Sequence, residues 1–299
     1  MLDFRGVFAP TTTPFDPETG DLDLVGMRSN ARELLACGLR GLVLFGSTGE
    51  GLLLDEGERV AGLEAIAELA EDALVLAGAA AESTRATVRL TRDAAEAGAD
   101  AVLVAPPAYY RPQLTPEALR AHYRAVADAS PIPILLYQVP PVYSGVELQA
   151  GLVGELAKHP NIQGIKDSTG DLQAMGEILN VCTSDFAVLV GSGTVLYGAL
   201  DVGACGGILA VADLAPRMAV DTFRLKAEGR DPEAGALQER LAPLHRAVVG
   251  KFGVPGVKAA LDLLGQVGGP PRSPLLPLNE KERVAVRAAL ETAELLQPS

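Results

Sequence analysis

Residues 132–167 read IPILLYQVPPVYSGVELQAGLVGELAKHPNIQGIKD, and this stretch holds the repeating unit of the fold. A short apolar run, IPILLY (132–137), leads through a helix-like segment at 147–158 to a second run, IQGIKD (162–167). Strands that are short and almost wholly apolar are typical of parallel sheets covered on both faces. The stretch therefore predicts a strand, a helix and a second strand parallel to the first.

The same alternation continues through most of the chain. Strand-like segments lie at 6–15, 41–46, 73–80, 101–107, 132–137, 162–167, 186–193 and 206–212, and helix-like segments at 22–38, 54–71, 84–97, 115–129, 147–158, 171–182, 194–201 and 213–227. Eight strands, each followed by a helix, predict an α/β fold of the (β/α)₈ TIM-barrel type. A doubly wound open sheet is the alternative, but for nucleotides it carries a glycine-rich first turn, whereas the first loop here reads TTTPF.

Three more helix-like segments follow the eighth unit, at 231–249, 256–265 and 279–296. A proline-rich connector, GGPPRSPLLPLN (268–279), joins the last two, and no linker separates the tail from the rest. We therefore expect a barrel domain at 1–228 and C-terminal helices at 229–299 that pack on it.

Composition excludes several classes of partner. The 299 residues carry a formal net charge of −13, which argues against binding to nucleic acid or to an anionic membrane surface. The three cysteines lack CxxC spacing, so neither a disulfide framework nor a zinc site is indicated. The N-terminus lacks the pattern of a signal peptide and the apolar runs are too short to span a membrane. A cytoplasmic protein is the expectation.

Polar side chains gather at the predicted carboxyl ends of the strands, where barrel enzymes carry their chemistry. The set comprises hydroxyls, tyrosines, glycines and one lysine: Ser47, Thr48, Tyr109, Tyr110, Tyr137, Lys166, Ser168 and Gly191. No histidine or carboxylate cluster occurs there, so we expect no divalent metal site. The turn GSTGE (46–50) lacks the ending of a phosphate-binding loop, but its hydroxyls and amides can hold a carboxylate.

Lys166 stands where a strand pattern calls for an apolar residue. An amine that projects into a barrel is desolvated, which favours its neutral, nucleophilic form, and such an amine attacks a ketone to give an imine. The alternative is a lysine that snorkels to the strand end with no chemical role. Tyr137 ends the preceding strand and favours the first interpretation, because imine formation needs a proton shuttle.

Four motifs in register, GSTGE, YYRP, LYQVP and GIKDSTGD, resemble the dihydrodipicolinate synthase / N-acetylneuraminate lyase superfamily of class I pyruvate aldolases, over essentially the whole chain. The resemblance implies that Lys166 forms the Schiff base with pyruvate and that Tyr137 shuttles protons. It implies that Ser47 and Thr48 bind the pyruvate carboxylate, and that Tyr110 reaches into the site of a neighbouring subunit. A homotetramer, a dimer of dimers, without metal or organic cofactor is the family pattern.

Three more positions match residues around the substrate of family members. Gly191 matches a glycine that lines the site, and Ile208 matches a residue whose carbonyl faces the lysine. Ser168, directly after the lysine and aspartate, matches a residue near the bound substrate in the 4-hydroxy-2-oxoglutarate aldolase branch.

Several stretches resemble that branch most, among them HPNIQGIKDSTGD (159–171) and KFGVPGVKAALDLLG (251–265). Thr48 departs from it, because the branch usually carries asparagine there. Dihydrodipicolinate synthases carry an arginine shortly after their LYNVP motif, whereas YQVPPVYSGVEL (137–148) has none and is one residue longer. Gln138 also departs from the asparagine of the neuraminate lyases. The pocket for the aldehyde, around 141–144, is therefore the part of the site that the motifs define least.

We expect cleavage of a 4-hydroxy-2-oxo acid, such as 4-hydroxy-2-oxoglutarate, to pyruvate and an aldehyde such as glyoxylate. Condensation of pyruvate with aspartate semialdehyde, or aldol cleavage or dehydration of a 2-keto-3-deoxy sugar acid, are alternatives on the same Schiff base. A non-enzymatic 2-oxo-acid sensor is a further class, and it would be favoured by a damaged set of site residues. A phosphosugar barrel is another, but GSG (191–193) has no cation beside it in the sequence.

Overall fold

The computed structural model describes residues 2–140 and 142–297. Eight parallel strands form one closed barrel in chain order, and β8 pairs with β1 to close it. The strands are β1 (Gly6–Ala9), β2 (Gly41–Leu44), β3 (Leu74–Gly78), β4 (Ala101–Val104), β5 (Ile134–Gln138), β6 (Ile162–Asp167), β7 (Ala187–Val190) and β8 (Gly206–Ile208). The predicted TIM-barrel fold is confirmed.

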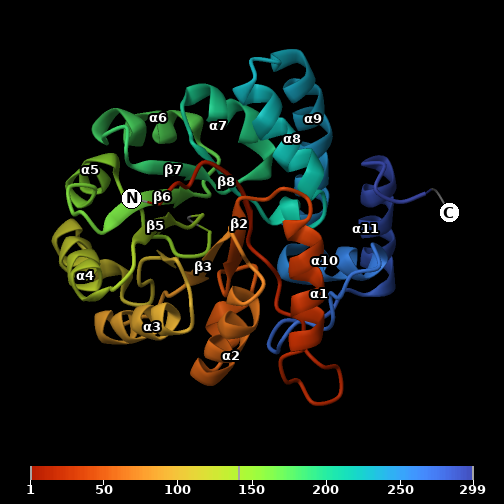
Figure 1. Cartoon of the computed structure of the whole chain (residues 1–299), viewed down its shortest axis with the longest axis horizontal. Coiled ribbons are helices and arrows are strands. Elements are labelled where there is room, and N and C mark those ends of the chain that lie inside the picture. Colours follow the sequence, from red (N-terminus) through yellow and green to blue (C-terminus); the bar gives the residue numbers. More distant parts are fainter. Residues whose placement is uncertain (1, 141, 298–299) are drawn as a thin grey trace.

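Helices surround the strands, as Figure 1 shows. They are α1 (Leu24–Leu35), α2 (Glu56–Ala67), α3 (Thr84–Glu96), α4 (Pro116–Ala129), α5 (Ala150–Leu156), α6 (Leu172–Val181), α7 (Leu196–Val202) and α8 (Pro216–Ala227). Side chains start several of them: Ser83 accepts a hydrogen bond from the amide of Ala86, and Asp171 accepts from Gln173 and Ala174. Such caps satisfy amides that have no partner within the helix.

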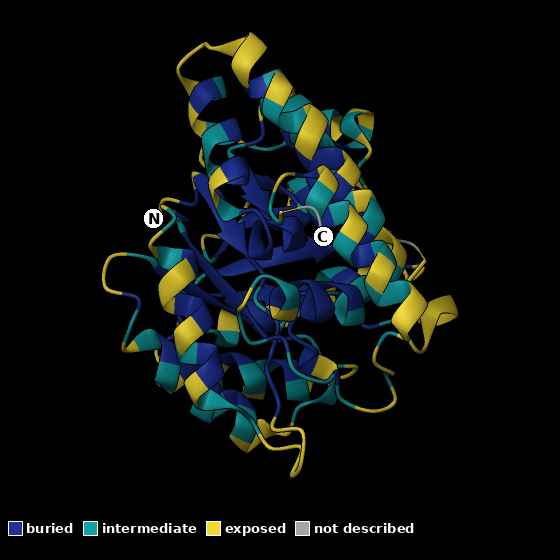
Figure 2. Ribbon diagram, turned by 90° about the vertical axis from the view of Figure 1, so that its right-hand side faces the viewer, coloured by how far each residue is buried: buried dark blue, intermediate teal, exposed yellow. Residues whose placement is uncertain are grey.

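Two apolar layers hold the barrel together. An inner cluster fills the space enclosed by the strands and includes Phe8, Val43, Leu76, Leu103 and Leu135. A larger outer cluster lies between the strands and the helices. Figure 2 shows the strands buried along almost all of their length, whereas the helices expose one face. Strands packed on both faces explain why their sequences are apolar without alternation.

The C-terminal tail adds α9 (Asp231–Leu244), a π-helical turn at His245–Gly250, α10 (Lys251–Leu263) and α11 (Glu280–Thr292). Helix α10 bends at Gly253, whose φ of 57° is not helical. The side chain of Asn30 in α1 exchanges two hydrogen bonds with the backbone of Val267, at 2.8 and 3.0 Å, and so ties the tail to the barrel. No helix within the described residues is long and apolar enough to cross a membrane. The domain boundary at residue 228 stays a prediction.

The segment 206–212 differs from its predicted form. The strand ends at Ile208, and residues Ala210–Asp213 form a 3₁₀ turn. Val211 and Ala212 are fully buried in that turn, so they are as apolar as strand residues. A short buried run looks the same in sequence whether it is extended or turned.

Candidate active site

Lys166 and Tyr137 lie side by side on neighbouring strands. Their Cα atoms are register partners between β6 and β5, and Leu189 of β7 is the partner of Lys166 on the other side. Tyr137 and Leu189 belong to the inner apolar cluster, so the same register turns Lys166 into the barrel. Lys166 is 6% exposed, and its Nζ lies 4.5 Å from the centre of the Tyr137 ring. The two residues that the sequence singles out are thus brought together.

The surroundings of the Tyr137 phenol lower its pKa. Burial by itself raises its pKa, but the positive charge of Lys166 and hydrogen bonds with Ser168, Ser47 and Lys166 lower it by more. The pKa of Tyr137 therefore lies below its ordinary value of 10.0. A phenol with a lowered pKa gives up its proton more readily near neutral pH. The same contacts place Ser168 and Ser47 at this phenol.

Ser168 and Gly191 fit tightly against one another at the ends of β6 and β7. The amide of Ser168 donates to the carbonyl of Gln138, and the amide of Gly191 donates to that of Asp167 at 2.6 Å. A Cβ atom added at Gly191 would lie 1.8 Å from Ser168 Oγ, so only glycine fits at this position. Ile208 ends β8, is fully buried and shares the inner cluster with Tyr137.

The turn after β2 carries Ser47 and Thr48 and has an unusual backbone. Ser47 is exposed and Thr48 is half-buried. Phe45 and Glu50, on either side of them, have φ angles of 58° and 54°, a left-handed conformation that costs free energy in residues with a Cβ. Such strain persists only where the surroundings enforce it. This turn presents hydroxyls and amides that can hold an anionic group.

Tyr110 lies apart from the other predicted site residues. It is 66% exposed and contacts Tyr109 edge to face, with ring centres 5.1 Å apart. The carboxylate of Glu82 accepts hydrogen bonds from the amides of Ala108 and Tyr109 and so fixes the loop after β4. Within one chain, Tyr110 is therefore largely exposed, and among the described residues no contact joins it to Lys166.

The loop after β5 is held by Gln138, one of the departures from the family pattern. Its Nε2 donates to the carbonyls of Val139 and Val146, and its Oε1 accepts from the amide of Leu148 at 2.6 Å. A glutamine side chain thus bridges a loop that is one residue longer than usual. Of the predicted aldehyde pocket at 141–144, Pro141 lies outside the described residues.

Arg111 supplies a charge that the sequence of this loop lacks. A Cβ added at Gly145 would lie 2.2 Å from Arg111 Nη1, so the guanidinium packs directly on the loop after β5. Arg111 belongs to the short 3₁₀ turn at Arg111–Gln113, after β4. The family motif places an arginine only within residues 137–148, so this contact between two separate loops does not follow from the sequence.

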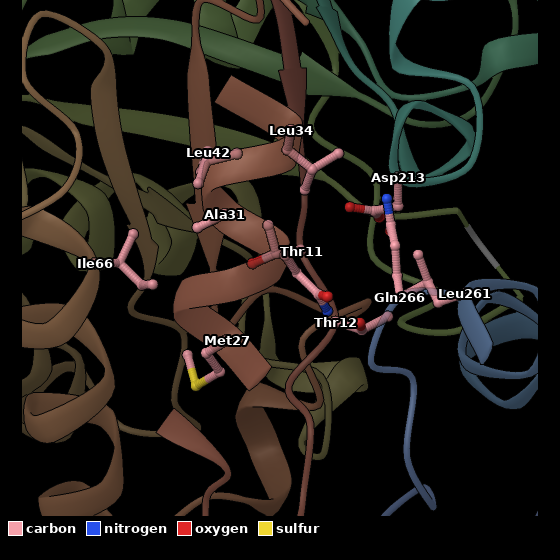
Figure 3. A pocket seen from close by; sticks show the side chains of 11 residues that line it. Thr11, Thr12, Met27, Ala31, Leu34, Leu42, Ile66, Asp213, Leu261 and Gln266 are labelled. Carbon is pink, nitrogen blue, oxygen red and sulfur yellow. The ribbon is translucent and has the colours of Figure 1, made fainter. Parts of the chain in front are cut away.

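Asp213 is the second residue that motif reading missed. It lies at the end of the 3₁₀ turn after β8, is 2% exposed, and its Oδ2 has no hydrogen-bond partner among the described residues. Burial raises the pKa of Asp213 well above its ordinary value, and the positive charge of Lys166 opposes that rise. Figure 3 shows it beside a small cavity, with Gln266 extending toward it from the tail. The signal for Asp213 in the sequence was a carboxyl group in the segment that follows the eighth predicted strand.

Comparison with known proteins extends these observations. The model of the dihydrodipicolinate synthetase family matches residues 3–293. A 4-hydroxy-tetrahydrodipicolinate synthase of Methanothrix thermoacetophila is 38% identical over 288 residues, which cover 96% of each chain. An L-threo-3-deoxy-hexylosonate aldolase of Hypocrea jecorina is 34% identical over 305 residues, covering 96% of this chain and 95% of that protein.

A solved structure shares the fold. It is a prophage protein of the dihydrodipicolinic acid synthase family from Escherichia coli K12, in complex with pyruvate, with a TM-score of 0.91 and 28% identity over 99% of this chain and 100% of that one. The names of the relatives do not support placing the chain nearest the 4-hydroxy-2-oxoglutarate aldolases, and favour the synthase alternative. By a match that spans almost its whole length, the chain belongs to the dihydrodipicolinate synthetase family.

Proposed function

We propose that Lys166 forms an imine with pyruvate and that this chain joins the resulting enamine to an aldehyde that carries a carboxylate. The chain is a class I, pyruvate-dependent aldolase of its family. The observation that carries the residue assignment is the inward-facing Lys166, 6% exposed, with its Nζ 4.5 Å from the Tyr137 ring centre. Among the residues that the structure describes, no second lysine stands at a strand end in the barrel.

The chemistry follows from this pair. The neutral amine of Lys166 attacks C2 of pyruvate, and Tyr137 carries a proton to the carbinolamine oxygen, which leaves as water. The protonated imine withdraws electrons, so C3 loses a proton and an enamine forms. The enamine carbon then bonds to the carbonyl carbon of the aldehyde, whose oxygen takes up a proton. Water finally hydrolyses the imine and frees Lys166. The same steps in reverse cleave a 4-hydroxy-2-oxo acid.

Ser47 and Thr48 are the proposed ligands of the pyruvate carboxylate. Their turn follows β2, and Ser47 hydrogen-bonds to Tyr137, which brings the turn to the reacting centre. Hydroxyl and amide donors that converge on a carboxylate give it a fixed orientation, and orientation is a large part of catalysis. Ser168, Gly191 and Ile208 would form the surrounding wall.

Aspartate semialdehyde is the aldehyde that we propose first. The synthase names of the relatives favour it. Arg111 favours it as well, because its guanidinium lies on the loop after β5 and forms no hydrogen bond or ion pair within the described residues. An unpaired guanidinium beside a substrate pocket is suited to bind a carboxylate through two hydrogen bonds.

Cleavage of 4-hydroxy-2-oxoglutarate is the second candidate. Two observations favour it: residues 137–148 contain no arginine of their own, and Ser168 contacts the Tyr137 phenol. Glyoxylate is also an aldehyde with a carboxylate, so Arg111 does not separate these candidates. A 2-keto-3-deoxy sugar acid is a third, supported by the deoxy-hexylosonate aldolase among the relatives.

Borohydride reduction tests the lysine. With pyruvate present, wild-type protein should gain one stable adduct on Lys166 that mass spectrometry locates. Lys166→Ala should gain none, whereas Lys158→Ala, which removes a lysine outside the barrel interior, should react like wild type. Absence of an adduct in the wild type would refute the Schiff-base assignment.

A substrate panel then tests the aldehyde. Rates of condensation of pyruvate with aspartate semialdehyde should exceed the rates of pyruvate release from 4-hydroxy-2-oxoglutarate and from 2-keto-3-deoxy sugar acids. Arg111→Met should raise the KM for the semialdehyde at least tenfold and leave the KM for pyruvate unchanged. If pyruvate release from 4-hydroxy-2-oxoglutarate is faster, the second candidate replaces the first.

A homotetramer in which Tyr110 serves a neighbouring site is part of the proposal. The loops after β2, β4 and β5 expose large apolar side chains, Leu52, Tyr109, Tyr110, Val142 and Tyr143, each at least 66% exposed. Single chains rarely leave such side chains clustered in solvent. Mixing the inactive variants Lys166→Ala and Tyr110→Phe should restore about a quarter of wild-type activity, because hybrid dimers then contain one intact site. No recovery on mixing would show that Tyr110 acts in its own chain or not at all.

A further inference from the structure

A buried ion pair joins the turn after β2 to the C-terminal tail. Lys258 of α10 places its Nζ 2.6 Å from Glu50 Oε1, and these two side chains are 1% and 0% exposed. Lys258 also donates to the carbonyl of Pro270 at 2.8 Å and lies over the Phe15 ring, 4.3 Å from its centre. Charges buried this completely persist only when they are paired and hydrogen-bonded.

Arg272 adds a second connection to the same place. Its amide donates to Glu50 Oε2 at 2.7 Å, so both carboxylate oxygens of Glu50 are held by the tail. Its guanidinium forms two hydrogen bonds with Glu58 in α2, at 2.6 and 2.7 Å, and these hydrogen bonds lower the pKa of Glu58. The segment after α10 is thereby fixed against α2 and the turn at once.

The contacts of Glu50 with Lys258 and Arg272 hold a strained backbone in place. Glu50 has a φ of 54°, where a glycine would be unstrained, and its neighbour Gly51 leaves no room for change, since an added Cβ would lie 1.9 Å from the Phe45 carbonyl oxygen. A carboxylate held at both oxygens can keep a strained residue in place. Ser47 and Thr48 stand three and two residues before it, respectively.

We propose that Glu50, which is paired with Lys258 and hydrogen-bonded to the Arg272 amide, is a positioning residue that fixes the carboxylate-binding turn. The C-terminal tail thereby completes the pyruvate subsite. The inference rests on the proposed function, since it assumes that Ser47 and Thr48 hold pyruvate. It assigns to α10 and the segment after it a role in substrate binding, although neither contributes a side chain that contacts the substrate.

Two variants unpair the buried charges. Lys258→Met removes the ammonium and keeps an unbranched side chain, and Glu50→Gln removes the carboxylate charge with little change of shape. Both should raise the pyruvate concentration that gives half-maximal borohydride trapping of Lys166 at least tenfold. Their kcat at saturating pyruvate should fall less than that concentration rises, because neither substitution removes a contact of Lys166 and only the Ser47 contact of Tyr137 lies on the turn. If Lys258→Met does not fold, the half-maximal pyruvate concentration of Glu50→Gln decides whether the inference holds.

Leu290→Ala is the matched control. Leu290 is fully buried in α11, so its truncation destabilises the tail without touching the turn. Its half-maximal pyruvate concentration should stay within twofold of wild type even though its melting temperature falls. An increase equal to that in Lys258→Met would overturn the inference, because general loosening of the tail would then explain the effect.

The two proposals fail in different ways. Wild-type protein that forms no adduct at any pyruvate concentration overturns both. Wild-type trapping with an unchanged half-maximal concentration in Lys258→Met and in Glu50→Gln overturns only the role of the tail, and leaves the Schiff base in place.

Discussion

The contact between Gly191 and Ser168 gives the sharpest single test of the site. In Gly191→Ala, the new Cβ would meet Ser168 Oγ at 1.8 Å. Carbon atoms do not approach oxygen closer than about 3.0 Å, so Ser168 Oγ has to move by roughly 1.2 Å, away from the hydrogen bond that it makes with Tyr137. A shift of about 1 Å in a catalytic group costs on the order of a hundredfold in rate. We therefore expect kcat to fall about a hundredfold, with a loss of unfolding free energy of about 1–3 kcal/mol from overpacking.

The assay is pyruvate turnover in three variants and the wild type. Ser168→Gly alone loses the hydroxyl contact with Tyr137, and we expect a fall of about tenfold, since one hydrogen bond contributes about 1 kcal/mol. The double variant Gly191→Ala with Ser168→Gly removes the atom that clashes at 1.8 Å but leaves a short contact of 2.9 Å to the backbone Cα of Ser168. Its activity should therefore lie between those of Gly191→Ala and Ser168→Gly, and the two losses should not multiply. Full activity in Gly191→Ala would refute the geometry on which this reasoning depends.

Three further predictions concern other parts of the chain. Tyr137→Phe should keep the fold and lower the rate of adduct formation by about 10²–10⁴, measured by stopped trapping; a change below threefold would remove Tyr137 from proton transfer. Gln138→Ala leaves the Val139 carbonyl and the Leu148 amide without a partner and should cost about 2–4 kcal/mol in urea unfolding; an unchanged midpoint would contradict its bridging role. Burial lowers the pKa of His122 from 6.5 to about 4, so its contribution to stability is complete above pH 6.5 and is lost as the pH falls toward 4. The unfolding free energy of wild type should fall between pH 7 and pH 5 by about 2 kcal/mol more than that of His122→Gln, and equal falls would argue against a neutral buried imidazole.

Sequence pattern was sufficient for the barrel because every strand is buried on both faces. Apolar runs such as ILLYQ in β5 and AVLV in β4 cannot be solvent-exposed edges, and eight of them in alternation with helices leave few other folds. The pattern failed at Ala210–Asp213, where a turn is as buried as a strand. The break that the pattern predicts between 249 and 256 contains the non-helical Gly253, although helical turns continue on both sides of it.

The part of the site that could be predicted is the part in which contacts between residues follow from the order of the strands. Lys166 and Tyr137 end adjacent strands, so their proximity follows from the fold, and the structure places them in register. Contacts between segments distant in sequence do not follow in this way. The guanidinium of Arg111 on Gly145 and the pairing of Glu50 with Lys258 depend on loop and tail packing that no periodicity encodes.

The apolar cluster inside the strands has a consequence for the order of events. Phe8, Leu76 and Leu135 are fully buried inside the barrel, and Lys166, which projects into the same interior, is 6% exposed. On the proposed Schiff-base chemistry, an aldehyde has nothing to react with until the ketone has converted the amine of Lys166 to an enamine. The ketone should therefore bind before the aldehyde, and the joined product should leave before the next ketone enters.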